Sequence, residues 1–371
     1  MISLASSLHA IHTACGIFLF FGAFFSNGRF FYGIMELSKK TFQGGIAMCV
    51  IYMMSEETKA IKDHGRLILY RRDEKVASQP IRHISGVVVT KQAHITMPLV
   101  YALLEEGIPI SYMDFRGRVL GVLGGERISL EHLFRQKEVM ERPKEQIRLV
   151  REIVCRKIGS QRRLLKEYSY RERELQAMAA IGRLAACAHK AKYLMDLEVL
   201  RGMEGAASRV YFSAFPCLLD EKIWHWEGRA QHPAHDAVNA LLNYGYAFLE
   251  KEVRLALAGS GLDARLGFFH ANNGRKDSLV YDMMEPYRHD VLDRLVLNLL
   301  RGGSFTPDDF SVTGEECRLS PAAKKIWAAH YENYMEKPMA RYDGLSPREM
   351  IRREIETFGT RVLRKKGDGD V

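Results

Sequence analysis

The sequence lacks the cysteine patterns of zinc sites and of dithiol redox centres. It has six cysteines among 371 residues, and no two of them form a Cys-x-x-Cys pair or stand at zinc-like spacing from histidine. We expect reduced, mostly buried thiols, as in cytoplasmic proteins. The sequence also has no G-x-S-x-G elbow, no P-loop and no complete dinucleotide fingerprint, which disfavours the enzyme classes that depend on them.

Charged residues are missing from the start of the chain. Arg29 is the first Lys, Arg, Asp or Glu, and residues 16–25 are very apolar. A signal peptide should open with positive charge, and glycines, polar residues and two histidines interrupt the stretch as a membrane span. We therefore expect residues 1–47 to be a mis-called start and Met48 to be the true first residue. A membrane tether through residues 11–25 is the alternative.

The composition is that of a globular protein with excess positive charge. Hydrophobic residues make up 47% and charged residues 27% of the chain, the formal net charge is +9 and the pI is about 9.2. A chain of this length predicts about two domains. The basic balance suits an anionic partner such as nucleic acid, although it also fits a membrane surface.

The hydrophobic pattern changes character near residue 128. Short β-favouring runs separated by turn residues predict strands at 50–54, 66–70, 84–90, 108–113 and 119–123, with one helix over 96–106. Helical periodicity dominates afterwards. We predict an α+β protein, with a small β-rich domain over 48–128, a larger all-helical domain over 129–358 and a basic tail over 359–371. The Lys- and Arg-rich segment 135–170 is either a solvated helix face or a phosphate-contacting surface.

A carboxylate with small neighbours lies in the segment that we predict as one helix over 190–215. Glu204, Ser208 and Tyr211 share a face of this helix. Gly202 and Gly205 weaken a helix, which is tolerable where a backbone or a ligand approaches closely. Glu204 could therefore bind a metal ion that also touches phosphate. The alternative is a helix–helix contact in which Glu204 pairs with an arginine.

A histidine and an acidic pair follow further along the chain. His270 precedes a turn-like segment, and Asp282 and Glu285 stand three residues apart on a predicted helix that Pro286 kinks or ends. The histidine could be structural and the acidic pair could be a charged surface, but the apolar residues around the pair predict burial. Three carboxylates and an imidazole suit a hard divalent cation, either Mg²⁺ or Mn²⁺.

Four motifs stand in a fixed order along the chain, in the segments 200–212, 236–246, 267–270 and 282–288. Together they resemble the CRISPR-associated protein one family, the integrase of CRISPR adaptation. The segments 84–110 and 116–118 resemble the β domain of the family, and the resemblance covers about residues 48 to 358. It implies a β-rich N-terminal domain for dimerisation and DNA contact, followed by a helical metal-dependent catalytic domain.

The resemblance also implies the site and the partners. The metal ligands of the family fall on Glu204, His270 and Glu285, and Asp282 matches an acidic position that acts as an auxiliary ligand or supports the ligands. Arg209, Tyr211, Arg275 and Lys276 are the expected DNA contacts; Tyr211 is expected to position rather than to attack. The implied partners are double-stranded DNA, a second copy of the chain, and a dimer of a small ferredoxin-like protein in a heterohexameric complex.

The implied activity is metal-dependent DNA cleavage and insertion of captured DNA into the CRISPR array by attack of a 3′-hydroxyl on a phosphodiester. Two alternatives remain at this stage: a non-catalytic DNA-binding scaffold of the adaptation complex, and a general metal-dependent nuclease.

Overall fold

The described part of the chain folds into two compact units, which divide between Gly124 and Ile128. The computed structural model describes residues 49–53, 57–90, 93–114, 119–124, 128–169, 174–231, 233–272 and 276–364. The expectations about the translation start and about a membrane tether fall on residues 1–48, which lie outside this range. Within the described ranges, no helix is both long and apolar enough to cross a membrane.

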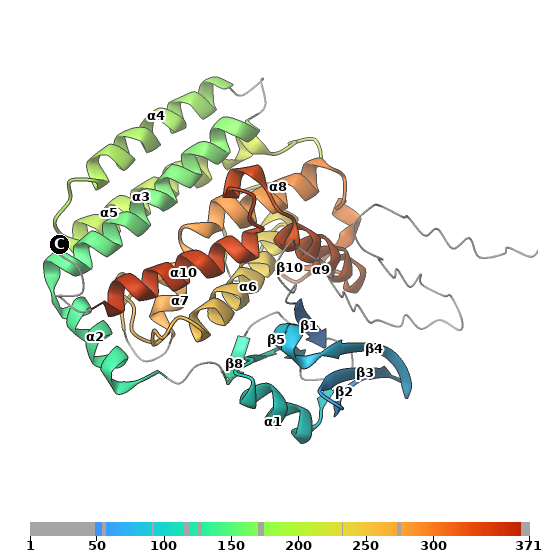
Figure 1. Cartoon of the computed structure of the whole chain (residues 1–371). Helices are drawn as coiled ribbons and strands as arrows, with labels where there is room; N and C mark the ends of the chain where they lie inside the picture. Colours follow the sequence, from blue (N-terminus) through green and yellow to red (C-terminus); the bar gives the residue numbers. More distant parts are fainter. Residues whose placement is uncertain are drawn as a thin grey trace, which may run out of the picture. The chain divides into compact units, whose positions relative to one another are not determined.

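The described residues of the N-terminal unit form two sheets and one α-helix (Figure 1). Its elements are β1 (Cys49–Met53), β2 (Thr58–Asp63), β3 (Arg66–Arg71), β4 (Glu74–Pro80), the short 3₁₀ helix η1 (Ile81–His83), β5 (Ile84–Thr90), β6 (His94–Ile95), α1 (Met97–Glu105), β7 (Ile110–Met113) and β8 (Val119–Leu123). The strands and the helix predicted in this region are present. The sequence prediction missed β2 and β4, in which charged residues interrupt the apolar pattern, and β6, which is only two residues long.

Each sheet mixes parallel and antiparallel pairs. In the order β1-β5-β7-β8, β5 pairs in parallel with β1 and β7, and β8 closes the edge antiparallel to β7. In the order β4-β3-β2-β6, β2 and β3 form a hairpin whose turn places His64 and Gly65 at φ values of 42° and 73°. Side chains of both sheets and of α1, among them Leu67, Val87 and Leu103, form one buried cluster. This cluster is the core of the unit.

The C-terminal unit is mostly helical. Its elements are α2 (Leu130–Glu141), α3 (Pro143–Tyr168), α4 (Glu174–Ala191), α5 (Leu197–Ser213), η3 (Phe215–Leu218), α6 (Ala237–Ala258), α7 (Ser278–Met284), the π-helix η4 (Arg288–Asp293), α8 (Arg294–Arg301), η5 (Pro307–Asp309), β9 (Phe310–Thr313), β10 (Glu316–Leu319), α9 (Pro321–Glu336), η6 (Ala340–Tyr342) and α10 (Pro347–Leu363). The predicted class, a β-rich region followed by a helical one, is confirmed. The β9–β10 hairpin is an addition to the predicted all-helical domain.

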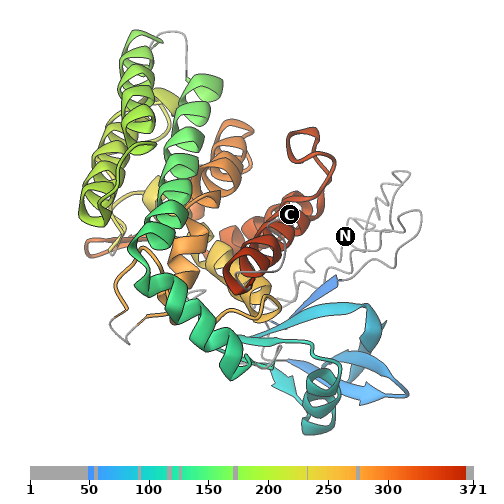
Figure 2. The same cartoon turned by 60° about the vertical axis from the view of Figure 1, so that its left-hand side comes forward.

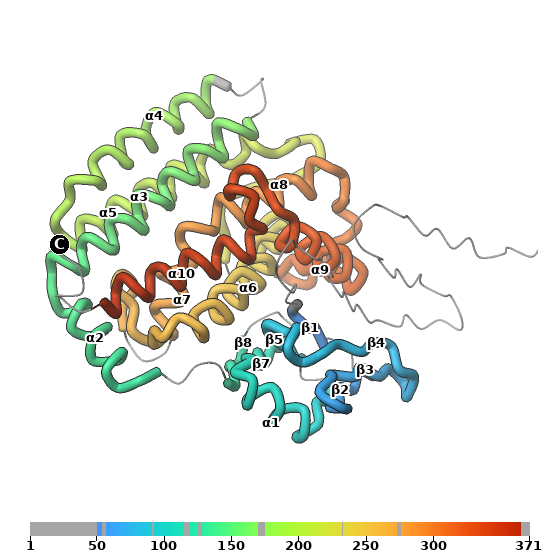
Figure 3. The backbone as a smooth tube through the Cα atoms, viewed as in Figure 1, coloured from blue at the N-terminus to red at the C-terminus, as the bar shows by residue number. Residues whose placement is uncertain are grey.

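Two sets of helices build this unit. Helices α3, α4 and α5 lie side by side in Figures 1 and 2, and each packs on the other two. Helix α10 runs along α6, as the tube in Figure 3 shows, and also packs on α9. Buried Phe248, Trp327 and Tyr331 join α6 to α9 through edge-to-face ring contacts.

The helix that carries Glu204 begins later than predicted. The prediction of one helix over 190–215 is wrong at its start, because α4 ends at Ala191 and α5 begins at Leu197. The Asp196 carboxylate accepts a hydrogen bond of 2.9 Å from the Val199 N–H and caps α5. Such a cap satisfies an N–H group that has no partner within the helix, so the chain starts a new helix here.

A buried charge network connects α6, α9 and α10. Arg348 contacts Glu252, Glu332 and Glu336, and Lys251 lies 2.9 Å from Glu252. Burial alone would raise the pKa of Glu252, but the charges of Arg348 and Lys251 outweigh it and lower the pKa from 4.5 to about 2. Glu252 therefore stabilises the fold above its unfolded pKa, and this contribution disappears as the pH falls from about 4.5 towards 2.

We predict that Glu252→Gln lowers the free energy of unfolding at pH 7 by about 3–5 kcal/mol, because it removes the buried anion that contacts both Arg348 and Lys251. The acid dependence of stability should also become shallower between pH 4.5 and 2. Urea denaturation at several pH values measures both effects. Glu356→Gln is the control, since Glu356 is 52% exposed and pairs with the exposed Arg352. An equal effect of the two substitutions would contradict the prediction.

Candidate active site

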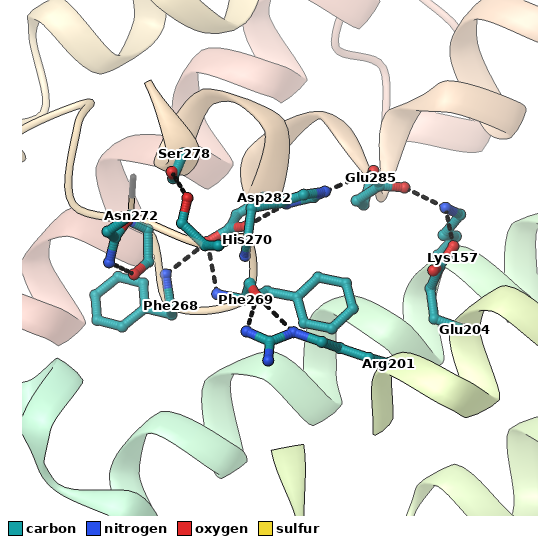
Figure 4. A network of polar contacts seen from close by, with 12 residues as sticks. Lys157, Arg201, Glu204, Phe268, Phe269, His270, Asn272, Ser278, Asp282 and Glu285 are labelled. Atoms are coloured by element: carbon teal, nitrogen blue, oxygen red, sulfur yellow. Dashed lines mark hydrogen bonds and ion pairs between the residues drawn. The ribbon is translucent and has the colours of Figure 1, made fainter. Parts of the chain in front are cut away.

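The three predicted ligands come from three different segments of the helical unit. Glu204 lies in the middle of α5, His270 lies in the loop between α6 and α7, and Glu285 follows the last residue of α7. Pro286 comes directly after Glu285 and a new helix starts at Arg288, so the predicted break is present. Figure 4 shows these side chains in one row of contacts, from His270 to Glu285 and from Glu285 through Lys157 of α3 to Glu204.

Asp282 holds the loop that carries His270. Its carboxylate is fully buried and accepts hydrogen bonds from three consecutive N–H groups, those of Phe268 (2.6 Å), Phe269 (2.9 Å) and His270 (2.9 Å). The same carboxylate lies 2.6 Å from His270 Nδ1. This contact places the proton on Nδ1 and leaves the Nε2 lone pair free to bind a cation. Of the two roles left open for Asp282, these contacts support the positioning role.

Side chains from other helices fasten the same loop. Arg201 of α5 donates to the Phe269 carbonyl from Nε (3.1 Å) and Nη2 (2.6 Å), and Gln146 of α3 donates to the Phe268 carbonyl (2.8 Å). The Asn272 side chain closes the loop on Gly267 through bonds of 2.8 and 3.0 Å. The position of His270 is therefore set by α3, α5 and α7 together (Figure 4).

Lys157 lies between the two glutamates. Its ammonium group contacts Glu204 Oε1 and lies 2.5 Å from Glu285 Oε2. Arg288 Nε donates to the other oxygen of Glu285 at 3.1 Å. Burial would raise the pKa of Glu285, but Arg288 and Lys157 together lower it to about 2, so the carboxylate is ionised at neutral pH.

The donors suit a divalent cation. His270 Nε2 lies 3.9 Å from Glu285 Oε1. Two ligands that each bind one ion at about 2.1 Å lie between about 3.0 and 4.2 Å from each other, depending on the angle at the ion. The imidazole and the carboxylate therefore have a spacing that one ion could bridge. No group of three or more His, Cys, Asp or Glu side chains within the described ranges already surrounds a metal position, and Lys157 stands between the two carboxylates.

A buried chain of polar groups leads from Glu204 into the core. Ser208 Oγ donates to Glu204 Oε1 (2.9 Å), and Gln161 Nε2 lies within hydrogen-bond distance of Ser208 Oγ (3.4 Å) and of His289 Nε2 (3.0 Å). At the other end of the chain of contacts, Asp293 Oδ2 lies 2.7 Å from His289 Nδ1 and 2.8 Å from the Tyr211 hydroxyl. The π-helix η4 supplies His289 and Asp293. π-Helical turns are frequent at functional sites.

The expected contact of Tyr211 with DNA requires a correction. The Tyr211 side chain is fully buried, and its hydroxyl donates to Asp293. Burial and the Asp293 carboxylate raise the pKa of this hydroxyl well above its ordinary value, which keeps it protonated. Tyr211 is therefore a structural residue next to the site, in agreement with the expectation that it is no nucleophile.

The family of this chain follows from a match to a protein-family model. The model that describes the CRISPR-associated protein Cas1 matches residues 51–333, which is more than half of the chain. The chain belongs to the Cas1 family. Its motif-based resemblance to that family is thereby confirmed.

Relatives in the Cas1 family include both single proteins and fusions. The "CRISPR-associated endonuclease Cas1 1" of Thermus thermophilus is 34% identical over 249 residues, which is 67% of this chain and 74% of that protein. A "CRISPR-associated exonuclease Cas4/endonuclease Cas1 fusion" of Rhodospirillum rubrum is 30% identical over 332 residues, 86% of this chain. The chain spans 56% of the length of that fusion and 53% of a second one, from Geobacter sulfurreducens.

Solved structures share the fold. A CAS1 protein from Thermotoga maritima matches with a TM-score of 0.71 at 22% identity, covering 87% of this chain and 99% of that one. A chain of a "Cas6-RT-Cas1--Cas2 complex" matches with a TM-score of 0.73 at 21% identity over 88% of this chain and 36% of that one. A "Casposase bound to integration product" matches with a TM-score of 0.70 at 21% identity over 87% and 93%.

The remaining predicted DNA contacts of this Cas1 family member lie on its surface or outside the described residues. Arg209 on α5 is exposed, as is Lys276, whose ammonium group lies 5.5 Å from the centre of the Tyr281 ring. Arg275 lies outside the described ranges. None of these three residues is tested as a DNA contact, so their role stays a prediction.

The glycines of α5 face open space rather than another helix. A Cβ atom at Gly202 would meet nothing within 4 Å, and one at Gly205 would meet only the end of the Arg209 side chain at 3.6 Å. Helix packing within the described residues therefore does not require these glycines. Among the described residues, the ion-pair partner of Glu204 is Lys157, whereas the helix–helix alternative expected an arginine.

We predict that Gly202→Ala raises the free energy of unfolding by about 1 kcal/mol, because alanine favours a helix interior and finds free space there. Gly267→Ala is the contrasting variant. Its Cβ would approach Ser278 Cβ to 2.7 Å and Asp282 Oδ2 to 2.9 Å, so stability should fall. Urea denaturation compares the two, and a loss of stability in Gly202→Ala would show that this face is packed after all.

Sequence reasoning did not identify Lys157 as part of the site and gave Arg201 no role in it. Lys157 belongs to the charged segment 135–170, for which a solvated helix face was one of two interpretations. A signal was present, because Lys157 stands three residues after Val154 and four before Gln161, both buried positions of α3. A lysine on the buried face of a helix indicates a partner of opposite charge. Arg201 stands three residues before Glu204, but its contact with the His270 loop depends on the tertiary fold.

Proposed function

We propose that this Cas1 family member is a metal-dependent DNA endonuclease and integrase of CRISPR adaptation, which inserts captured DNA fragments into a CRISPR array. The observation that carries the proposal is the oriented imidazole: Asp282 binds His270 Nδ1 at 2.6 Å, and His270 Nε2 faces Glu285 at 3.9 Å. Membership of the Cas1 family, the endonuclease named in relatives and the integration product named in a structural neighbour support the activity.

The residues that would hold a divalent ion are Glu204, His270 and Glu285. When bound, Mg²⁺ or Mn²⁺ would lower the pKa of the attacking hydroxyl and neutralise charge at the phosphate. The chain itself keeps Glu285 ionised through Arg288 and fixes the imidazole through Asp282. Asp282 supports this arrangement through its hydrogen bonds to the backbone of the His270 loop and to the imidazole.

The proposed reaction exchanges one phosphodiester for another. The 3′-hydroxyl oxygen of the captured DNA forms a bond to a phosphorus atom of the target strand, and the bond between that phosphorus and its original 3′-oxygen breaks. The attacking hydroxyl loses its proton and the released 3′-oxygen gains one. The number of phosphodiester bonds stays constant, so no nucleotide cofactor is needed. Arg209, Lys276 and Arg275 are proposed phosphate contacts.

We further propose a cytoplasmic complex in which two homodimers of this chain flank a dimer of a small ferredoxin-like protein. The support is the presence of Cas2 beside Cas1 in the name of a structural neighbour and the basic charge of the chain. The size of the complex and the choice between Mg²⁺ and Mn²⁺ are part of the proposal.

Strand transfer on branched DNA that mimics a half-completed integration tests the proposal. The full chain is incubated with this substrate in Mg²⁺, in Mn²⁺ and in EDTA. Rejoining of the target strand with either metal, and none in EDTA, is the expected result. Unspecific degradation would point to a general nuclease, and binding without reaction would point to a scaffold.

A further inference from the structure

Lys157 is a nearly buried cation with two anionic partners. Its side chain is 9% exposed, while those of Glu204 and Glu285 are 21% and 6% exposed. The ammonium group contacts one oxygen of each glutamate. Lys157 comes from α3, Glu204 from α5 and Glu285 from the end of α7, so a single charge connects three segments of the unit (Figure 4).

Two carboxylates at such close range repel each other unless a cation lies between them. Arg288 donates to Glu285 Oε1 at 3.1 Å, whereas Glu204 contacts Lys157 and Ser208. The cation between the two carboxylates is Lys157. An ammonium group on a flexible stem is a point charge that can move aside, unlike the planar fork of an arginine.

We propose that Lys157 acts as a resident counter-ion in the metal-free protein: it holds Glu204 and Glu285 together and leaves at least one of them when a divalent cation binds. This inference rests on the proposed function, because it concerns the metal ligands named there. The oxygens that contact Lys157 are oxygens that a metal ion would need, and one oxygen cannot give its best contact to both cations at once. Lys157 is thus a positioning residue that competes with the metal.

Lys157→Met tests the competition, because methionine keeps most of the length and removes the charge. We expect Mn²⁺ affinity, measured by electron paramagnetic resonance of free Mn²⁺ without DNA, to rise roughly tenfold. We also expect a lower melting temperature in EDTA and a larger rise on adding Mn²⁺ than in the unchanged protein. Lys166→Met is the control, since Lys166 is exposed on the same helix.

A second variant keeps the test decisive if Lys157→Met does not fold. Lys157→Arg retains the charge and should keep its melting temperature in EDTA, with Mn²⁺ affinity no higher than that of the unchanged protein. An unchanged or weaker Mn²⁺ affinity in Lys157→Met, or a gain in Lys157→Arg, would overturn the inference.

Glu204→Gln separates this inference from the proposed function. If the unchanged protein binds Mn²⁺ and Glu204→Gln does not, the metal site exists, and the Lys157 variants then decide the inference alone. If Glu204→Gln leaves Mn²⁺ binding unaltered, the proposed ligand set is wrong and the inference falls with it.

Discussion

Replacement of His270 by alanine should reduce metal-dependent strand transfer by on the order of a thousandfold, while DNA binding changes little. The imidazole is 39% exposed and its Nδ1 is held by Asp282, so it presents Nε2 to the site and contributes little to the core. Its removal takes away one proposed ligand but leaves the basic surface that would attract DNA. Initial rates on branched DNA measure the effect, and fluorescence anisotropy measures the affinity.

The matched control is His225→Ala. The His225 side chain is 75% exposed and pairs with Glu227 outside the site, so its removal should leave both readouts unchanged. A His270→Ala variant that keeps its rate would remove the imidazole from the reaction. Equal loss of rate and of DNA affinity, together with a lower melting temperature, would indicate a folding defect instead.

Asp282→Asn should lower the free energy of unfolding by about 3 kcal/mol, because hydrogen bonds to a buried charged acceptor each contribute about 1.5–3 kcal/mol. The asparagine amide keeps one acceptor oxygen. Its NH₂ group is a donor and would face backbone N–H groups that now donate hydrogen bonds to the carboxylate. The imidazole loses its orientation at the same time, so strand transfer should fall by about 10–100-fold. Urea denaturation and initial rates measure the two effects.

Asp196→Asn provides the comparison for Asp282→Asn. Asp196 caps α5 from an exposed position, and asparagine is an equally good N-cap. It should therefore change stability by only a few tenths of a kcal/mol. If Asp282→Asn were equally harmless, the charge of Asp282 would not be what holds the His270 loop. A rate loss without a stability loss would favour direct binding of a metal ion by Asp282.

Much of the fold could be predicted from the sequence because the relevant signals are local. The apolar runs 66–70 and 84–90 predict strands whatever surrounds them, and both strands are present in the structure. The boundary between α4 and α5 could not be predicted from periodicity, since apolar and polar residues continue through it. It depends on the capping contact of Asp196.

The candidate site divides in the same way. Motif spacing identified Glu204, His270, Asp282 and Glu285 as candidate metal ligands, since the separations within each helix and the break at Pro286 follow from chain geometry. Sequence reasoning placed Tyr211 on the same face as Glu204, which is correct for the helix, but only the packing of η4 against α5 turns that side chain into the core.

The sequence by itself determined the class of fold, the family and the residue types available for chemistry, because helix and strand periodicity and motif order are properties of the chain. Only the tertiary structure decided what each charged group faces. It aims the Asp282 carboxylate at the loop of His270 and inserts Lys157 between Glu204 and Glu285. Lys157 and Glu204 stand 47 positions apart, and such a contact arises from the packing of helices rather than from any local pattern.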